Sequence, residues 1–587
     1  MTAQRQPFGR AFYLANGMEI FERLAWYGFF SLSSLYLTSP ISQGGLGFSD
    51  QDRGYIQGMI PFLLYLLPVL TGALADRYGY RRMFLCSFAL MAPGYFLLGQ
   101  VHSFWAFFAV FLLVATGAAC FKPVVVGTVG RCSNDSNRGL AFGIFYTMVN
   151  IGGFLGPLLA GYLRAISWDL VFLLSSCWIL VNVLPAWLWY REPPAPGPAD
   201  RRSLRQVLAD MQLVLGNGRL ALLVLPLLFL LLISPRLDNP APLLWLAAFW
   251  LLLNLAWSLL QSGASTTVAT TAWYRQPLRV GNRAFVLYLL ILTGYFTAYM
   301  QLFITLPLYL RDYVNTADLV QLLAHWLPGS LDYLAAVNVQ QLADALPGFA
   351  TQYQQALLDQ QALPNQQAIE TVLADISRQL AHHKIQLPTS VLAQGLTALA
   401  QQQTDALILA SDWRAQYRQI NPEYIVNLGF LTIVLCQIAI SRFIMRWQAL
   451  PVLVGGTVLL ALGLMLCGLS ATAAGGGLLA IAGVLLFSVG EMVTSPKSQE
   501  YVAAIAPQRQ TAMYMGYYFV AMALGNLFAG LLSGWAYGYF GLNIQQPVLM
   551  WYLFGAIAVL TAGALCLFQL SLSRSNSSAQ TRPISSY

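Results

Sequence analysis

The sequence predicts an all-α polytopic membrane protein, and its composition supports this before any motif is considered. Of its 587 residues only 9% are charged and 57% are hydrophobic, whereas about 25% of the residues in ordinary soluble proteins are charged. The mean hydropathy is +0.60. A soluble domain this apolar could not keep its surface hydrated. The composition therefore excludes a disordered chain, a fibrous repeat and a typical soluble enzyme, and it makes the lipid bilayer the expected environment.

Apolar runs long enough to span a bilayer recur along the chain. A span needs roughly 20 mostly apolar residues, and fourteen runs fit this description. Six precede a segment rich in Pro and Arg, two very apolar runs follow it, and six more complete the set. The expected ranges are 11–38, 55–75, 83–101, 103–126, 139–163, 168–190, 219–234, 241–260, 284–310, 421–443, 450–470, 475–495, 511–540 and 549–571.

An internal repeat predicts that twelve of these spans form two six-helix halves. The segment GGFLGPLLAGY at 152–162 aligns without gaps on GNLFAGLLSGW at 525–535. Each segment lies in the fifth span of a set of six. Two six-helix halves are the architecture of transporters that work by alternating access. The two spans within 219–260 then form an added hairpin, which gives fourteen spans in all.

The chain divides into five expected regions. These are an N-terminal six-helix bundle, a cytoplasmic linker with the extra hairpin, a C-terminal six-helix bundle, an outer insertion within that bundle, and a cytoplasmic tail. The insertion is rich in Gln, Ala and Leu at helical spacing, so we expect a helical domain outside the membrane, with a disordered linker as the alternative. The boundaries are 1–190, 191–283, 284–310 with 421–571, 311–420, and 572–587.

The distribution of charge predicts the orientation and excludes other classes of protein. With the N-terminus inside, the short outside loops carry only Arg53, Arg164 and Arg236, so both termini are expected to be cytoplasmic. The net charge of +8 forms no single stripe or tail, so no nucleic acid partner is expected. The seven cysteines form no CxxC pair, and neither HExxH, GxSxG nor a P-loop occurs. We therefore expect no metal, no cofactor and no enzyme activity.

The first span carries charges where the bilayer interior should be. Glu19, Glu22, Arg23 and Tyr27 lie within it, although a charge at mid-membrane costs about 2.5–3.5 kcal/mol on insertion scales. Residues four apart share a helix face, as Glu19 and Arg23 do. One guanidinium cannot fully neutralise two carboxylates, so one of them is expected to carry a proton; a structural ion pair near a helix end is the alternative.

Two lone charges in later spans are further candidates for a functional site. Lys122 lies in CFKPVVVG and Glu491 lies in FSVGEMVTSP. A buried lysine presents a compact charge and can lose its proton, which arginine cannot. The structural alternatives are a lysine that snorkels to the cytoplasmic interface and a glutamate that caps a helix.

The segment GALADRYGYRR, which closes the second span, resembles the signature loop of the major facilitator superfamily. The resemblance implies the major facilitator fold. Physically the segment can act as a charged latch whose glycines allow a tight turn, so its expected role is conformational. Its residues are Gly72, Asp76, Arg77, Gly79, Arg81 and Arg82.

Further motifs resemble those of the proton-dependent oligopeptide transporters of bacterial type, within that superfamily. They include the ExxER motif of the first span, FYTMVNIG in the fifth, and GE followed by SP in the tenth core span. The resemblance covers nearly all of the chain except 311–420. It implies a monomeric symporter in the bacterial inner membrane, which couples the movement of protons to that of di- and tripeptides.

The same resemblance implies roles for individual residues. Arg23 and Lys122 are expected to bind the peptide carboxylate and Glu491 its amino group. Glu22, alone or together with Glu19, is expected to carry the coupling proton beside Arg23. The asparagines expected to bind the peptide backbone, and the tyrosines expected to line the pocket, are Asn150, Asn421, Tyr27, Tyr65, Tyr146 and Tyr518.

Two departures from the family pattern keep other functions open. Met300 stands where the family usually has an acid before Gln301, and Tyr518 stands where a Trp is expected. One alternative is a diverged member that carries another small anionic or zwitterionic solute. Another is a non-transporting membrane sensor whose outer insertion binds a partner of unknown identity.

Overall fold

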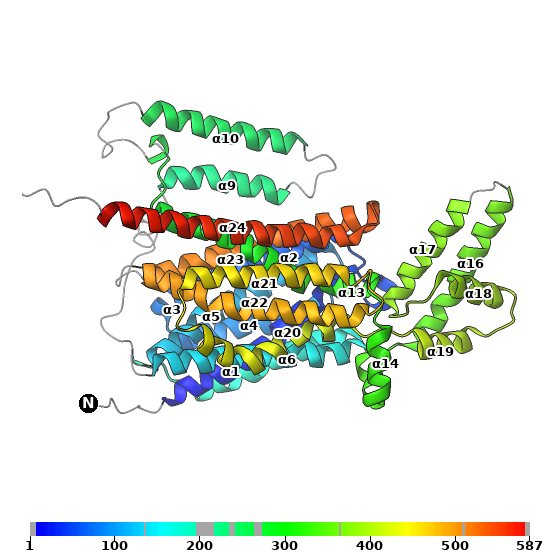
Figure 1. Cartoon of the computed structure of the whole chain (residues 1–587). Helices are drawn as coiled ribbons and strands as arrows, with labels where there is room; N and C mark the ends of the chain where they lie inside the picture. Colours follow the sequence, from blue (N-terminus) through cyan, green and yellow to red (C-terminus); the bar gives the residue numbers. More distant parts are fainter. Residues whose placement is uncertain are drawn as a thin grey trace, which may run out of the picture.

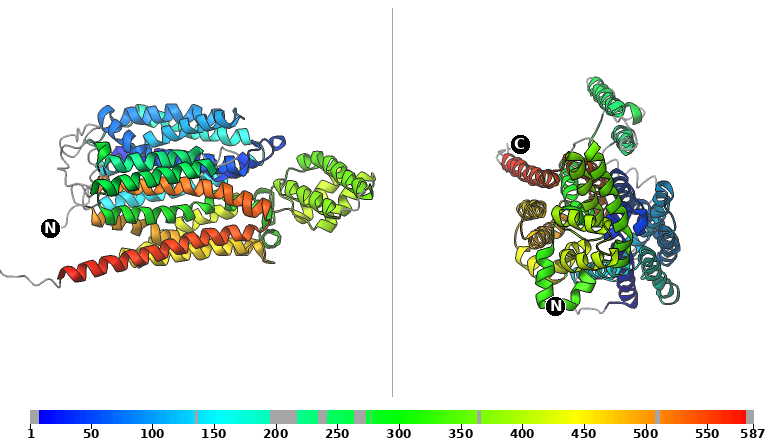
Figure 2. Two further views of the ribbon diagram at one scale, coloured as in Figure 1. Left: turned by 90° about the horizontal axis from the view of Figure 1, so that it is seen from above. Right: turned by 90° about the vertical axis from the view of Figure 1, so that its right-hand side faces the viewer.

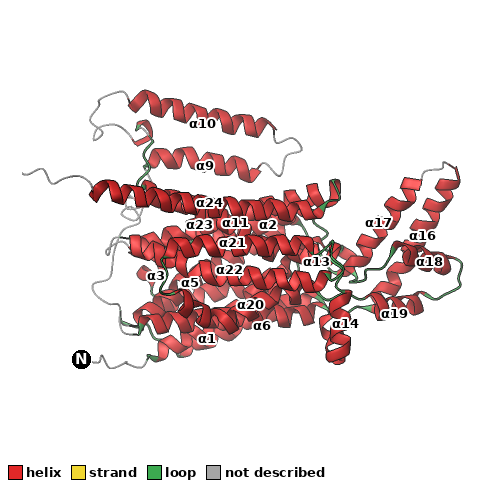
Figure 3. Cartoon of the chain, viewed as in Figure 1, coloured by secondary structure: helices red, strands yellow, loops and turns green. Residues whose placement is uncertain are grey.

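A computed structural model describes residues 8–133, 137–194, 217–233, 241–262, 273–276, 278–362, 366–506 and 511–580. The elements of these residues are helices, and one isolated bridge pairs Ile385 with Arg418. Long helices run side by side in a bundle, and a smaller group of helices extends beyond one end of it (Figure 1, Figure 2). Figure 3 shows the helices and the loops that connect them. The expected all-α membrane fold is confirmed.

The first half of the bundle contains the helices that precede residue 190. Pro68 begins a new helix directly after Leu67, so the second expected span consists of two helices. The elements are α1 (Arg10–Thr38), η1 (Ile41–Gln43), α2 (Asp50–Leu66), α3 (Pro68–Tyr78), α4 (Tyr80–Leu98), α5 (Phe104–Arg131), α6 (Arg138–Arg164) and α7 (Trp168–Leu188).

The second half follows the added hairpin and is interrupted by the insertion. The hairpin contains α9 (Gly218–Ile233) and α10 (Ala241–Ser262), followed by η3 (Trp273–Arg275). The second half contains α11 (Arg283–Tyr299), α12 (Gln301–Ile304), α13 (Leu306–Tyr313), α20 (Pro422–Ile444), α21 (Ala449–Leu469), α22 (Gly476–Ile505), α23 (Thr511–Ala536), the π-helix η5 (Tyr537–Asn543) and α24 (Pro547–Gln580).

Each of the fourteen ranges expected to span the membrane is occupied by helix. Among the described residues, nine helices are long and apolar enough to cross a bilayer. The hairpin helices are shorter apolar helices, and α1, α2 and α4 of the first half fall outside the nine. α1 is not among the nine because the charged residues Glu19, Glu22 and Arg23 lower its hydropathy. Fourteen spans therefore remains a prediction.

The two halves pack their helices in the same pattern. In the first half α1 packs against α6 and α7, α4 packs against α5 and α7, and α2 packs against α5. In the second half α11 packs against α23 and α24, α21 packs against α22 and α24, and α20 packs against α22. The halves meet along two seams, one between α2 and α23 and the other between α6 and α20. The short sequence repeat therefore reflects a repeat of packing.

Glycines of the repeat occupy equivalent close contacts. A Cβ added at Gly152 on α6 would lie 2.4 Å from the Cβ of Arg23 on α1. A Cβ added at Gly525 on α23 would lie 2.3 Å from the Cβ of Phe296 on α11. Small residues let transmembrane helices approach closely. Arg23 is thus the structural counterpart of Phe296.

The insertion folds as a helical domain beyond one end of the bundle, which confirms the expected helical insertion and not the disordered linker (Figure 1). Its later helices enclose a core of their own, which includes Leu346, Ile376 and Trp413. Its first helices instead join the bundle core through Leu319 and Leu331. The elements are α14 (Ala317–Trp326), η4 (Pro328–Ser330), α15 (Leu331–Leu334), α16 (Val339–Ala362), α17 (Gln366–His382), α18 (Thr389–Ala400) and α19 (Ala406–Tyr417).

The first helix of the insertion also supports a helix of the bundle. Asp318 on α14 accepts hydrogen bonds from the backbone N–H groups of Gly477, at 3.2 Å, and Leu478, at 2.8 Å. These groups belong to the first turn of α22, where donors have no partner inside the helix and a negative charge is favoured. Asp318 therefore belongs to the insertion in sequence, but its carboxylate caps a helix of the bundle.

Candidate functional site

Four charged side chains from α1 and α5 form a continuous chain of ion pairs. The Lys122 Nζ atom lies 2.7 Å from Glu19 Oε1, and the Arg23 Nε atom lies 3.4 Å from the same oxygen. Arg23 also donates to both oxygens of Glu22, from Nε at 2.5 Å and from Nη2 at 2.7 Å. The charges alternate along this group, which we call the α1–α5 charge cluster, and they sum to zero.

The two carboxylates of the charge cluster differ in their partners. Both are fully buried. Arg23 occupies both oxygens of Glu22, whereas Glu19 Oε2 has no hydrogen-bond partner among the described residues. A protonated carboxylic acid carries its proton on one oxygen and still accepts on the other. Glu19 can therefore take a proton without loss of a hydrogen bond, but Glu22 cannot.

A row of aromatic rings connects the charge cluster to the second half. Arg23 lies over the ring of Tyr27, 5.5 Å from its centroid. The centroid distance from Tyr27 to Phe430 is 5.1 Å, from Phe430 to Phe303 it is 5.6 Å, and from Phe303 to Tyr299 it is 5.3 Å. The row therefore crosses from α1 to α20 and on to α11 and α12.

Glu491, in the second half, lies at the end of this row of aromatic rings, next to Tyr299. Its Oε1 atom accepts a hydrogen bond of 2.7 Å from the hydroxyl of Tyr299, and the residue is 8% exposed. It lies in the interior of α22, so the interpretation of Glu491 as a helix cap is wrong. Tyr299 was not singled out from the sequence. The only signal for it is the aromatic richness of its segment, which a buried core would also produce.

The tyrosines expected to line the pocket lie on four different helices around this row. Tyr65 on α2 stacks on Phe519 of α23 with a centroid distance of 6.4 Å, at the α2–α23 seam. The Tyr518 hydroxyl lies 3.0 Å from the Ser498 hydroxyl on α22. Tyr146 on α6 is 38% exposed. The rings thus come from both halves.

The two expected asparagines are placed differently. Asn150 is buried on α6 and donates to the Tyr146 carbonyl at 2.8 Å. Asn421 precedes α20 at the insertion end of the bundle, where its backbone N–H donates to the Leu334 carbonyl at 2.8 Å. The structure therefore does not bring Asn421 to the charge cluster. Asn427, which the sequence did not single out, donates from α20 to the Phe154 carbonyl of α6 at 2.9 Å.

Hydrogen bonds hold the signature loop against the end of α7. It turns at Gly79, whose φ of +93° lies in the region that favours glycine. The backbone N–H of Tyr80 donates to the Glu192 carboxylate, and the Arg81 guanidinium donates to the Trp187 carbonyl. An acid is favourable at the beginning of α4. The loop thus joins the beginning of α4 to the end of α7, and its conformational role stays a prediction.

The remaining loop residues make fewer described contacts. Gly72 faces Pro123 of α5, beside Lys122 of the charge cluster, and a Cβ added there would lie 3.6 Å from the proline Cβ. Arg77 and Arg82 are exposed. The side chain of Asp76 lies outside the described residues.

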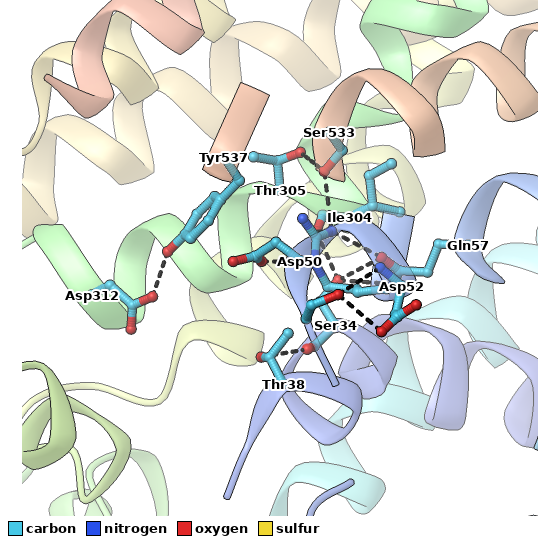
Figure 4. A network of polar contacts seen from close by, with 12 residues as sticks. Ser34, Thr38, Asp50, Asp52, Gln57, Ile304, Thr305, Asp312, Ser533 and Tyr537 are labelled. Carbon is cyan, nitrogen blue, oxygen red and sulfur yellow. Dashed lines mark hydrogen bonds and ion pairs between the residues drawn. The ribbon is translucent and has the colours of Figure 1, made fainter. Parts of the chain in front are cut away.

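A buried arginine joins the insertion end of the α2–α23 seam, and Figure 4 shows its partners Asp50, Gln57, Ile304 and Ser533. Arg53 on α2 is fully buried. Its Nη1 atom donates to Gln57 at 3.1 Å, to the Ile304 carbonyl at 3.1 Å and to Ser533 at 3.0 Å, and its Nε atom lies 3.3 Å from Asp50. These partners belong to both halves. The sequence identified Arg53 only as an outside loop charge, because its partners in the second half, a backbone carbonyl and the Ser533 hydroxyl, carry no sequence signal.

The α6–α20 seam is joined at the same end. Arg164 of α6 lies 3.4 Å from Glu423 of α20, and the Tyr333 hydroxyl of α15 donates to the Leu158 carbonyl of α6 at 2.6 Å. Both seams are therefore bonded at the end that faces the insertion. Met300, which stands where the family usually has an acid, is the residue that follows the last turn of α11.

Comparison with known proteins identifies the family. The family model described as Major Facilitator Superfamily matches residues 21–337 and 406–585, and the chain belongs to this superfamily. Within it, the chain is similar to the Peptide transporter YePEPT of Yersinia enterocolitica, with 30% identity over 197 residues. It is also similar to the Dipeptide and tripeptide permease A of Escherichia coli, with 28% identity over 189 residues.

These matches cover part of each chain. Each covers 31% of this chain, and they cover 38% and 36% of the two relatives, so the chain matches little more than a third of their length. A solved structure of a POT family transporter in complex with 5-aminolevulinic acid matches over 95% of this chain and 96% of that chain, with a TM-score of 0.61 and 16% identity. That likeness extends the shared fold to nearly the whole chain.

Proposed function

We propose that this protein is a proton-coupled symporter of di- and tripeptides that works by alternating access. Its similarity to peptide transporters supports the substrate class. The observation that carries the proposal is the α1–α5 charge cluster in the first half, with Glu491 at the far end of the aromatic row. Positive and negative anchors thus stand on opposite halves of the bundle.

A short peptide is a zwitterion whose charged ends match these two anchors. Its carboxylate pairs with Lys122 and Arg23, and its amino group pairs with Glu491. Charge-assisted hydrogen bonds of this kind are stronger than neutral ones. The tyrosines and phenylalanines between the anchors make apolar contacts that tolerate different side chains, as promiscuous sites require. In this proposal Asn150, which is buried on α6 one turn after Tyr146, hydrogen-bonds the peptide backbone.

Charge balance links the peptide to a proton. The charge cluster is neutral without substrate, because two acids face two bases. A peptide carboxylate adds one negative charge, and a proton on one acid restores neutrality at a buried site, where an unbalanced charge is expensive. When the peptide carboxylate takes Lys122, Glu19 loses its 2.7 Å partner. We therefore assign the proton to Glu19, with its free Oε2 atom, and give Glu22 the role of holding Arg23.

The arrangement described is closed toward the insertion. Arg53 and the Arg164–Glu423 pair join the halves at that end, so release of these contacts is the step that opens the outer side. In this proposal the insertion is outside the cell, both termini are cytoplasmic, the protein works as a monomer, and the membrane is a bacterial inner membrane. The proposed transport cycle requires no cofactor.

The decisive experiment is uptake of a labelled dipeptide into proteoliposomes under an imposed inward proton gradient. The wild-type protein is expected to accumulate the dipeptide, and Lys122→Gln is expected to abolish accumulation. Lys497→Gln is the matched control, because Lys497 is a buried lysine that donates to the Trp447 carbonyl at 2.9 Å, outside the charge cluster. It is expected to retain uptake.

Other outcomes distinguish the alternatives. Accumulation of a small amino acid but of no peptide would establish the diverged carrier. Absence of gradient-driven transport of either solute by folded wild-type protein would exclude symport of these substrates and leave the sensor.

A further inference from the structure

A polar cavity of about 190 Å³ lies where the insertion meets the ends of both halves. Its walls come from the end of α1, the segment between α6 and α7, α13, and the segment after α17. This volume exceeds what one water molecule needs. The cavity is separate from the charge cluster, with which it shares no residue, and the proposed transport function assigns it no task.

Three cationic side chains line the cavity, and no carboxylate is among the described lining residues. Arg164 lies 3.4 Å from Glu423, and Arg311 lies 2.5 Å from Asp312. Each guanidinium therefore has a carboxylate behind the wall. The two pairs together contribute no net charge.

The third cation, Lys384, forms no close ion pair with a carboxylate in the described part of the chain, although the Glu423 carboxylate is near enough to favour its charge. Its Nζ atom donates to the Ala336 carbonyl at 2.9 Å, and an ammonium group has three donors. His382 and His383 line the same cavity, and the Nδ1 atom of His382 is buried without a hydrogen-bond partner. The side chain of Gln43 lies 3.0 Å from the Nε2 atom of His383. Burial, together with the nearby Arg164, lowers the pKa of Lys384 to about 7. The cavity thus keeps unused donors and, when Lys384 is protonated, one positive charge without a close ion-pair partner.

We propose that this cavity binds a small monovalent carboxylate, with Lys384 as its counter-ion and the two arginines as the flanking wall. One negative charge balances the wall, whereas a dianion such as phosphate leaves an excess negative charge in a partly buried site. Guanidinium and ammonium groups are the natural donors to carboxylates. The carboxylate belongs to a free organic acid or to the C-terminus of a peptide, since the wall recognises the group common to both.

Binding there also ties the insertion to the closed bundle. Arg164 belongs to the first half, Arg311 to the second half and Lys384 to the insertion. A ligand that contacts all three stabilises the arrangement in which they meet, by an amount that grows with its concentration relative to its Kd. A carboxylate at this site therefore favours the state closed toward the insertion.

The test uses the purified full-length protein in detergent, in the Lys122→Gln background so that the charge cluster does not contribute. Isothermal titration calorimetry is carried out with acetate, N-acetylglycine, inorganic phosphate and glycinamide. Saturable binding of acetate or N-acetylglycine is expected, without binding of phosphate or glycinamide. Binding of N-acetylglycine but not acetate assigns the site to a peptide terminus, and binding of both assigns it to free acids as well.

Two substitutions at Lys384 distinguish the loss of its charge from a loss of folding. Lys384 has a φ of +62°, so Lys384→Gln and Lys384→Arg place similar side chains in the same strained backbone. Lys384→Gln is expected to weaken binding at least tenfold, and Lys384→Arg is expected to retain it. Arg414→Gln removes a cation of the insertion that pairs with Asp332 away from the cavity, and it should change nothing.

Four results would overturn the proposal. These are equal binding by Lys384→Gln, loss of binding in Lys384→Arg as well, preferential binding of phosphate, and the absence of saturable carboxylate binding. The wild-type protein is titrated in parallel. Since the site is measured without transport, failure here leaves the proposed transport function intact, and failure of uptake leaves this site intact.

Discussion

The two halves of the bundle share one packing pattern but not one chemistry. The repeated glycine of the fifth helix packs on Arg23 in the first half and on Phe296 in the second. One residue earlier on each first helix, Glu22 corresponds to Tyr295. Close helix contact is therefore duplicated, while the charged pair Glu22–Arg23 has uncharged counterparts, Tyr295 and Phe296, in the second half. The duplicated contact is what close helix packing requires, whereas the buried charges of α1, which are expensive in a membrane, are not repeated at the matching positions of α11.

The largest effect is expected from removal of one acid of the charge cluster. Glu19→Gln should lower gradient-driven accumulation of dipeptide about a hundredfold, because the charge cluster can no longer take up the coupling proton. A loss of this size is in the range expected when one partner of a desolvated, charge-assisted contact is removed. Exchange of labelled for unlabelled dipeptide should remain. Both rates are measured in the same proteoliposomes.

The second half supplies the control for this experiment. Tyr295→Phe changes the counterpart of Glu22 and should leave accumulation and exchange intact. If Glu22→Gln uncouples the two rates and Glu19→Gln does not, Glu22 carries the proton and the assignment to the free Glu19 oxygen is wrong.

Glycine substitutions test whether the packing is truly duplicated. Gly152→Ala and Gly525→Ala should each destabilise the protein by about 1–3 kcal/mol, as overpacking does in well-packed cores. Gly143→Ala and Gly516→Ala lie on the same two helices, where a Cβ would meet nothing within 4 Å, so they should be neutral or slightly stabilising. Thermal unfolding in detergent is the measurement. A large loss at only one of the two contact glycines would show that the halves are not equivalent.

The two seams between the halves should respond unequally. Arg53→Met removes donors to several groups and leaves Asp50 without its cation, so hydrogen exchange at the insertion ends of α2 and α23 should rise at least about tenfold, as for a broken buried pair. The double variant Arg164→Met, Glu423→Gln removes a single 3.4 Å contact without leaving a charge. Its exchange should rise less than about threefold. Equal increases in hydrogen exchange would mean that the two seams contribute equally to holding the halves together.

The smallest effect concerns pH at the contact between the insertion and the first half. Burial, together with the adjacent Arg311, lowers the pKa of His382 to about 3, although Asp312 opposes this shift, and burial with Lys384 lowers the pKa of His383 to about 4. Both side chains are therefore neutral when the insertion is docked and take up protons when it is released. Docking should be complete above pH 6.5 and should weaken as the pH falls toward 4.

Hydrogen exchange of α16 to α19 at pH 7.5 and pH 5 measures this dependence. His383→Gln cannot titrate and should reduce it, whereas His325→Gln, at an exposed position of the insertion, should not. If the pH dependence is unchanged in His383→Gln, protonation of His383 is not its cause.

Residues 311–420 show how far composition alone could divide the chain. Their change in composition predicted a helical insertion, and the separate core around Trp413 agrees with this. Composition could not show that α14 belongs to the bundle, because an aspartate that caps a distant helix resembles any exposed aspartate. Replacement of 337–417 would therefore spare Asp318, whereas replacement from residue 315 onward would remove it.

The sequence by itself determined the helical membrane fold, the twofold repeat and the buried charges. These depend on local composition, because a span is a continuous run of apolar residues and a charge within it is visible directly. Helical spacing placed Glu19 beside Arg23 for the same reason. The superfamily followed from motifs that are continuous in the chain.

Only the tertiary structure decided which groups share each site. It paired Lys122 with Glu19, 103 residues away, and Tyr299 with Glu491, 192 residues away. It also placed Asn421 at the insertion end and gathered the cavity wall around Lys384 from three parts of the chain. Such pairings depend on which helix faces meet across the bundle. No local pattern records this, because each face is apolar whichever partner it packs against.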